Sequence, residues 1–211
     1  MKERFSSHLF WGPYSPLSAL SGIGLIILAS SRFAFAIVCA GTLFWVYGLT
    51  TLVFASARNI MPSRGKSVVL LFLPTVFCAF FMLIIYLINP LLILGTSFLL
   101  LLVPPCCLGS GYFDLSEPVE TIEFVSRALY ESLSLSGIIL ALALIREPLG
   151  MGTLSIPGGL HGIVELFSIG QNAESFSLLR ILSVSAGAFL LLGYGTALYR
   201  FFRERNNPHH N

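Results

Sequence analysis

The chain has 211 residues, of which 55% are hydrophobic and only 10% are charged, and its formal net charge is +2. A soluble globular domain usually carries about 25% charged residues, so this composition excludes an ordinary soluble protein, as does the mean hydropathy of +0.86. The small net charge gives no reason to expect a nucleic-acid partner. We therefore predict a single integral membrane domain over residues 1–211, surrounded by the lipid bilayer.

Six apolar segments follow one another along the chain and predict about six transmembrane helices. They cover residues 17–30, 33–57, 67–88, 91–103, 128–145 and 181–199. A helix needs about 20 apolar residues to cross the hydrocarbon core, so the first and fourth segments are short. Helices are expected because a helix satisfies its own backbone hydrogen bonds in lipid, and the segments lack the alternation of barrel strands. The predicted fold is an all-α membrane protein.

Prolines and polar residues mark the ends of these segments. An Asn-Pro pair at 89–90 precedes the fourth segment and two prolines at 104–105 end it. Proline removes a backbone donor and disfavours helix in the residue before it. Acidic residues collect before the fifth segment, where they favour the positive end of a helix dipole. The glycine-rich loop 146–180 is predicted to contain a short amphipathic helix near residues 161–169.

The distribution of Lys and Arg predicts the orientation, because short cytoplasmic loops carry an excess of both. With a cytoplasmic N-terminus, three basic residues fall on the opposite side, namely Arg32, Arg146 and Arg180. The cytoplasmic side then holds the other nine, which are Lys2, Arg4, Arg58, Arg64, Lys66, Arg127, Arg200, Arg203 and Arg205. We therefore place both termini in the cytoplasm.

The two halves of the chain echo each other weakly. Ser-Pro-Leu at 15–17 opens the short first segment, and Asn-Pro-Leu at 89–91 opens the short fourth segment. Three segments per half invert the second half relative to the first, and short or Pro-interrupted segments at matching positions are typical of inverted repeats. We predict two inverted three-helix repeats, with the first and fourth helices as short half-helices. Chance similarity between apolar segments is the alternative.

Three stretches of the sequence resemble one family of membrane proteins. They are the start around Trp11 and residues 15–17, the loop 57–62 (Ala-Arg-Asn-Ile-Met-Pro), and residues 145–154 (Ile-Arg-Glu-Pro-Leu-Gly-Met-Gly-Thr-Leu). The last contains an Arg-Glu pair and a Gly-x-Gly-Thr-Leu signature. With these features the chain resembles the integral membrane subunits of the Rnf and Nqr complexes, specifically the subunit called E in Rnf and D in Nqr. These complexes are bacterial respiratory assemblies that couple electron transfer to ion pumping.

The resemblance implies a partner, a location and a cofactor. The family's two homologous six-helix subunits have opposite orientations. The implied partner is therefore an inverted homologous membrane subunit, together with other subunits of the complex, in the bacterial cytoplasmic (inner) membrane. Half-helices of the two subunits meet near the membrane centre, where cysteines hold an iron–sulfur cluster through which electrons cross the bilayer. Thiolates are the usual ligands of such clusters.

The cysteines of this chain depart from the family's pattern. The family has one ligand cysteine in each half, whereas here the first position falls on Gly24 or Leu25 and the second on Pro105. Cys106 or Cys107 takes the ligand role only with a local shift of the backbone. These two are the candidate cluster ligands. The alternatives are that they are small residues closing a proline-broken helix, and that this chain binds no cluster.

Three charged residues are candidates for an ion path or for a structural role. Glu131 lies near the start of the fifth segment, and an intramembrane carboxylate is functional by default. Its alternative is a side chain that extends to the membrane interface. Arg146 and Glu147 form either a structural ion pair at a helix end or an ion gate. The sequence has no nucleotide-binding loop, nucleophile motif or metal-spaced Cys/His set, so we do not expect a self-contained enzyme.

The sequence therefore predicts a membrane subunit of an Rnf/Nqr-type ion-translocating electron-transport complex. Its role is transmembrane electron transfer or scaffolding coupled to ion transport, and it is at most a non-catalytic subunit of the translocase. One alternative is a six-helix substrate-binding subunit of a solute transporter, and another is a structural membrane protein. Iron and co-purifying flavin-bearing subunits favour the first function, whereas a bound small molecule and co-purifying ATPases favour the transporter.

Overall fold

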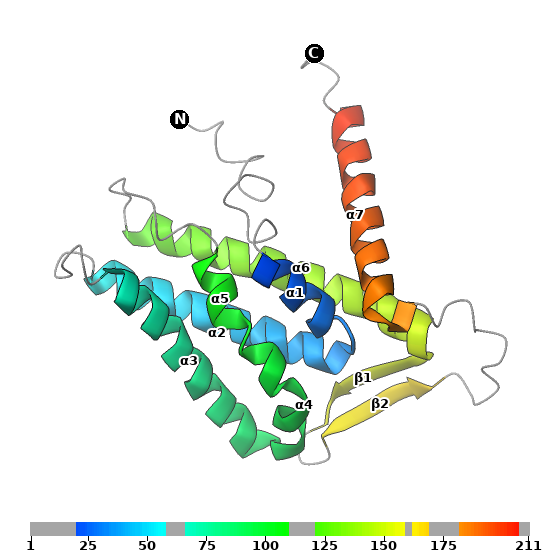
Figure 1. Cartoon of the computed structure of the whole chain (residues 1–211), viewed down its shortest axis with the longest axis horizontal. Coiled ribbons are helices and arrows are strands. Elements are labelled where there is room, and N and C mark those ends of the chain that lie inside the picture. Colours follow the sequence, from blue (N-terminus) through cyan, green and yellow to red (C-terminus); the bar gives the residue numbers. More distant parts are fainter. Residues whose placement is uncertain (1–19, 58–65, 110–120, 159–161, 169–181, 207–211) are drawn as a thin grey trace.

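The computed structural model describes residues 20–57, 66–109, 121–158, 162–168 and 182–206. These residues form seven helices and one antiparallel pair of strands (Figure 1). In chain order the elements are α1 (Leu20–Ala29), α2 (Phe33–Ala57), α3 (Lys66–Ile88), α4 (Pro90–Leu100), α5 (Val103–Leu108), α6 (Thr121–Met151), β1 (Thr153–Pro157), β2 (Ile163–Ser168) and α7 (Ser185–Asn206).

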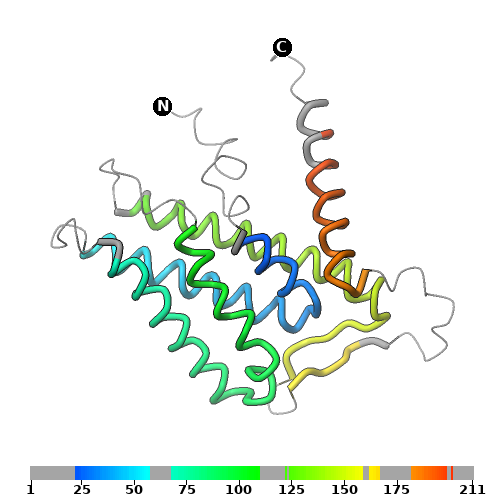
Figure 2. Tube along the Cα trace, viewed as in Figure 1, coloured from blue at the N-terminus to red at the C-terminus, as the bar shows by residue number. Residues whose placement is uncertain are grey.

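Four stretches within this part of the chain are long and apolar enough to cross a membrane. They are Phe33–Ala57, Val68–Ile88, Pro90–Leu108 and Phe124–Met151. The third combines α4 and α5, which are separated by a turn at residues 101–102. Consecutive spans run in opposite directions and lie together as a bundle (Figures 1 and 2). The predicted helical character is thus confirmed, with four candidate membrane spans in the described residues, while α1 and the apolar part of α7 (Ser185–Leu198) are shorter.

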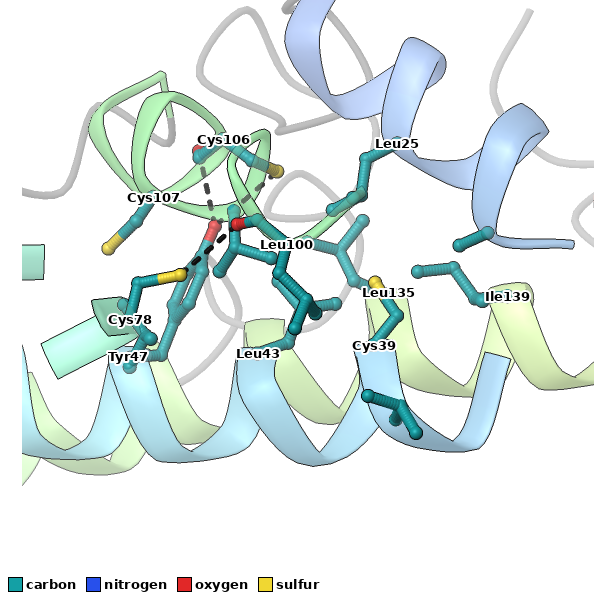
Figure 3. Packing of buried hydrophobic residues seen from close by; sticks show 14 of the residues in the cluster. Leu25, Cys39, Leu43, Tyr47, Cys78, Leu100, Cys106, Cys107, Leu135 and Ile139 are labelled. Carbon is teal, nitrogen blue, oxygen red and sulfur yellow. Dashed lines mark hydrogen bonds between the residues drawn. The ribbon is translucent and has the colours of Figure 1, made fainter. Parts of the chain in front are cut away.

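The centre of the bundle is the contact between α2 and α6. A methyl group at Gly48 would meet Leu129 Cδ2 at 3.5 Å, so the two helices approach closely there. Nearer one end of the bundle, the rings of Phe54 and Phe124 have their centroids 6.0 Å apart. Apolar residues on both helices are fully buried along this contact, including Leu43 and Leu135 (Figure 3). This long seam positions the residues discussed below.

The remaining helices pack around that seam to different extents. Helix α1 packs against α6 and α5, whereas α4 and α5 pack against α2 and α3. Helix α7 touches α1 and α6 near its start, where Ala188 is buried, and then projects away from the bundle (Figure 1). Large apolar residues further along α7, such as Leu190 and Tyr194, are exposed. Exposed apolar side chains also cover α3, as expected for lipid-facing helices.

The prediction of a short helix near residues 161–169 is wrong, and the fold is not purely α-helical. Ile163–Ser168 forms β2, which pairs antiparallel with β1. β-Branched residues favour strands, and the two segments are bordered by Gly152 and Gly162, whose φ angles of 68° and 79° suit glycine. The hairpin lies across the end of the bundle where α2 begins (Figure 1).

Two predicted helix ends also differ from the structure. Helix α6 runs from Thr121 to Met151, well beyond the predicted residues 128–145, because Pro148 lies in its last turn and interrupts little of the helix. The prolines at 104–105 begin α5 instead of ending the fourth segment. Proline is tolerated in the first turn of a helix, where its missing N–H has no helical partner to lose.

Candidate functional site

Glu131 lies in the seam between α2 and α6. It comes three residues after Ala128 and four before Leu135, and this spacing places all three on one face of α6. Ala128 and Leu135 are 1% and 0% exposed. The Ser136 hydroxyl donates to the Ala40 carbonyl oxygen at 3.4 Å. Together with the contacts of Gly48 and Phe54 described above, this antiparallel register puts Glu131 level with Tyr47 on α2.

The Glu131 carboxyl group is buried without a partner. The residue is only 5% exposed, and neither carboxyl oxygen has a hydrogen-bond partner in the described structure. On α2, the hydroxyl of the fully buried Thr50 also lacks a partner among the described residues. Burying an ionised carboxylate in such a place costs on the order of several kcal/mol. The side chain therefore lies inside the helix bundle and not on its surface.

Cys106 and Cys107 lie on α5 beside the same part of the seam. The Tyr47 hydroxyl donates to the Cys106 carbonyl oxygen at 3.2 Å and lies 3.9 Å from its sulfur (Figure 3). Tyr47, Cys106 and Cys107 are all close enough to Glu131 to interact with it electrostatically. We call Tyr47, Cys106, Cys107 and Glu131 the Glu131 cluster. It brings together three of the five residues that the sequence singles out.

The two cysteines do not fit a shared iron–sulfur cluster in this arrangement. A cluster takes about four thiolates, and one shared with a partner needs sulfurs that reach the surface. Cys106 and Cys107 are both 0% exposed. Within the described ranges, no group of three or more His, Cys, Asp or Glu residues is arranged to hold a metal ion. A ligand role would require α5 to move, and we derive no step through a cluster.

Arg146 ties α1 and the start of α7 to α6. Its Nε donates to the Leu182 carbonyl oxygen at 2.9 Å, and one terminal nitrogen donates to that of Ser183 at 3.0 Å. The other terminal nitrogen donates to the Ile27 carbonyl oxygen at 2.8 Å and to the Ser30 hydroxyl at 3.1 Å. Ile27 lies in the last turn of α1, where carbonyls lack helical partners and the dipole favours a cation.

Glu147 binds the beginning of α2. Its Oε2 accepts a hydrogen bond from the Phe33 backbone N–H at 2.6 Å. Phe33 is the first residue of α2, where free N–H groups and the helix dipole favour an anion. The next N–H, that of Ala34, donates to the Ser155 hydroxyl of β1 at 3.4 Å. Arg146 and Glu147 thus bind opposite ends of two different helices. Neighbouring residues on a helix do not face each other, which explains why they bind these partners instead of each other.

Tyr47, Thr50 and Asn89 are buried polar residues to which the sequence analysis assigns no role in a site. Asn89 Oδ1 accepts from the Leu92 N–H at 3.0 Å and so caps α4, while its Nδ2 donates to the Gly162 carbonyl oxygen at 2.9 Å and holds the hairpin turn. Asn before Pro at a helix start is a capping signature that predicts the first contact. Nothing in the sequence marks Tyr47 or Thr50 within the uniformly apolar α2.

Comparison with known protein families finds no family model that matches this chain, and no curated protein matches it.

Proposed function

We propose that this chain is an integral membrane subunit of an ion-translocating electron-transport assembly of the Rnf/Nqr type. The observation that carries the proposal is the set of contacts made by Arg146 and Glu147. These two residues belong to the stretch that most resembles the family, and they join the end of α1, the beginning of α2 and the start of α7. Because Arg146 and Glu147 hold these helix ends together, a structural role explains why the resemblance to the family is strongest at residues 145–154.

The packing supports an arrangement of two inverted three-helix repeats, α1–α3 and α4–α7, in which α4 and α5 count as one interrupted helix. Helix α1 of the first half packs on α6 of the second, and α4 and α5 of the second half pack on α2 of the first. The central α2 and α6 run antiparallel to each other (Figure 1). In this arrangement α1, with ten residues, is a half-helix of about 15 Å, roughly half the hydrocarbon thickness.

Within the assembly we assign the chain a scaffolding role coupled to ion transport. Two features support this assignment. The sulfurs of Cys106 and Cys107 are closed off from any neighbouring chain, which disfavours an electron path through them. The buried Glu131 carboxyl is a group of the kind found in ion paths through membrane proteins. The proposed partner is an inverted homologous subunit in the bacterial cytoplasmic membrane, with both termini of this chain in the cytoplasm.

Affinity purification of the tagged full chain from its native membrane, in mild detergent, tests the proposal. We expect flavin-bearing subunits and a second six-helix protein to co-purify in stoichiometric amounts. The same purification with Arg146→Met is expected to lose these partners or the protein itself, whereas Glu165→Gln on the exposed face of β2 keeps them. Co-purification with ATPase subunits would instead identify a transporter component, and a chain recovered alone would overturn membership of any such assembly.

A further inference from the structure

We infer that Glu131 is a proton-binding site within the helix bundle, where its carboxyl group holds an exchangeable proton while the seam between α2 and α6 is closed. The use of this proton in ion transport rests on the function proposed above. The proton-bearing carboxyl itself is argued from the geometry of the seam alone.

The position of Glu131 is one that packing alone would give to an apolar residue. Its neighbours on the same face of α6 are Ala128 and Leu135, and the fully buried Ile139 continues that face one turn further. Both oxygens of Glu131 lack hydrogen-bond partners in the described structure. A negative charge there would have no hydrogen-bond donor among the described residues, which favours a neutral carboxyl or one with a cation beside it.

The surroundings favour a proton over a metal cation. The groups that face Glu131 are the Tyr47 hydroxyl of α2 and the thiols of Cys106 and Cys107 on α5. The Tyr47 hydroxyl already donates to the Cys106 carbonyl oxygen. On α6 itself, Arg127 lies one turn earlier and does not hydrogen-bond the Glu131 carboxyl. Hard cations take about six or more oxygen ligands, and this set of side chains supplies far fewer.

Thr50 is a second buried polar residue on α2, near Tyr47. Its hydroxyl is fully buried and lacks a partner in the described structure. It lies one turn beyond Tyr47 on α2, toward the end of the bundle where α2 ends and α6 begins (Figure 1). From Thr50 to Ala57 the helix rises about 10 Å. The Thr50 hydroxyl and the Glu131 carboxyl do not hydrogen-bond each other in the described structure, so a proton would pass between them only if side chains move.

Carbodiimide labelling tests the site directly. Dicyclohexylcarbodiimide adds a carboxylic acid, together with its proton, across a C=N bond, and so reports protonated carboxyl groups in apolar surroundings. The detergent-purified full chain is treated with the reagent over a range of pH, and the modified peptides are quantified by mass spectrometry. We expect modification at Glu131. Once the carboxyl begins to ionise, each further pH unit should lower the labelling about tenfold.

The structure supplies an internal control on the same helix. Glu147 is 1% exposed, but its Oε2 accepts a hydrogen bond from the Phe33 N–H at the start of α2, whereas neither oxygen of Glu131 has a partner in the described structure. We expect Glu147 to remain unmodified and NaCl to leave the Glu131 labelling unchanged. If Na⁺ protects Glu131 from labelling, the site binds a metal cation and not a proton. If Glu147 is labelled to the same extent as Glu131, burial alone explains the reaction. Either result overturns the proposal.

Infrared spectroscopy covers the case in which the reagent does not reach the seam. The folded protein should have a protonated-carboxyl absorption that disappears in Glu131→Gln, and its absence from the folded wild-type chain overturns the proposal. Both measurements use the isolated chain. A positive result for Glu131 with no co-purifying redox subunits would therefore refute the proposed function and leave the proton site intact.

Discussion

Replacing Arg146 by Met should destabilise the protein severely. The guanidinium donates to three backbone carbonyls and one hydroxyl, and Arg146 itself is 3% exposed. Hydrogen bonds to a charged group contribute about 1.5–3 kcal/mol each, and a buried carbonyl left without a donor costs about 1–3 kcal/mol. The buried Ile27 carbonyl oxygen also accepts from the Ser30 hydroxyl at 3.1 Å, and Leu182 and Ser183 are half-buried. The contributions therefore fall short of a full sum. We therefore expect a loss of roughly 3–5 kcal/mol.

The cysteines provide the assay for this prediction. All four are buried and none forms a disulfide in the described structure, so a thiol-reactive fluorogenic dye reports their exposure on heating in detergent. For a chain of this length 1 kcal/mol corresponds to roughly 2–4 °C, which predicts a lower midpoint by about 6–20 °C. The Arg146→Lys variant retains a charge but has fewer donors, so its midpoint should lie between those of wild type and Arg146→Met. The midpoint of Glu165→Gln, at an exposed position, should equal that of wild type. An Arg146→Met protein whose free energy of unfolding lies within about 0.5 kcal/mol of the wild-type value would refute the reasoning.

Three further predictions use the same protein. Glu131→Leu should raise the free energy of unfolding by about 1–3 kcal/mol, and with it the unfolding midpoint, because it replaces a buried unpartnered carboxyl by an apolar group; a lower midpoint would mean that the carboxyl has a partner. Cys106→Ser combined with Cys107→Ser should leave the iron and acid-labile sulfide of the native assembly unchanged. Loss of the iron and the sulfide would instead show that these cysteines bind a cluster. Asn89→Asp should retain the cap of α4 but speed proteolysis at the hairpin, because only the Nδ2 donor to Gly162 is lost; unchanged cleavage would argue against that tether.

The sequence predicts the helical membrane character well because long apolar runs have few other stable forms. It underestimates the burial of Glu131 for a definite reason. Polar residues before Ala128 suggest that the fifth segment begins there, which places Glu131 at the membrane edge. The helix begins at Thr121, so Glu131 lies more than two turns inside it. Apolar content locates a span, but it does not locate the ends of a helix that extends past the span.

The hairpin and the role of Arg146 depend on contacts between distant parts of the chain. Strands β1 and β2 are short, and their pairing is supported by Ser155 against α2 and by Asn89 against Gly162. Arg146 and Ile27 are separated by 119 positions in the sequence. Local patterns identify Arg146 as unusual within an apolar segment, yet its partners are backbone carbonyls, which every residue has and no sequence pattern marks.

The contacts of Arg146 and Glu147 constrain the order in which this protein is built. Helices α1 and α2 are synthesised first, but the end of α1 and the beginning of α2 receive their charged partners only when α6 arrives. Until then these backbone groups depend on water or on an insertion machinery, because unpaired polar groups are costly in lipid. A nascent chain stopped after α3 should therefore be an unfinished unit and a target for membrane proteases, and synthesis of α6 becomes the step that commits the molecule to its native fold.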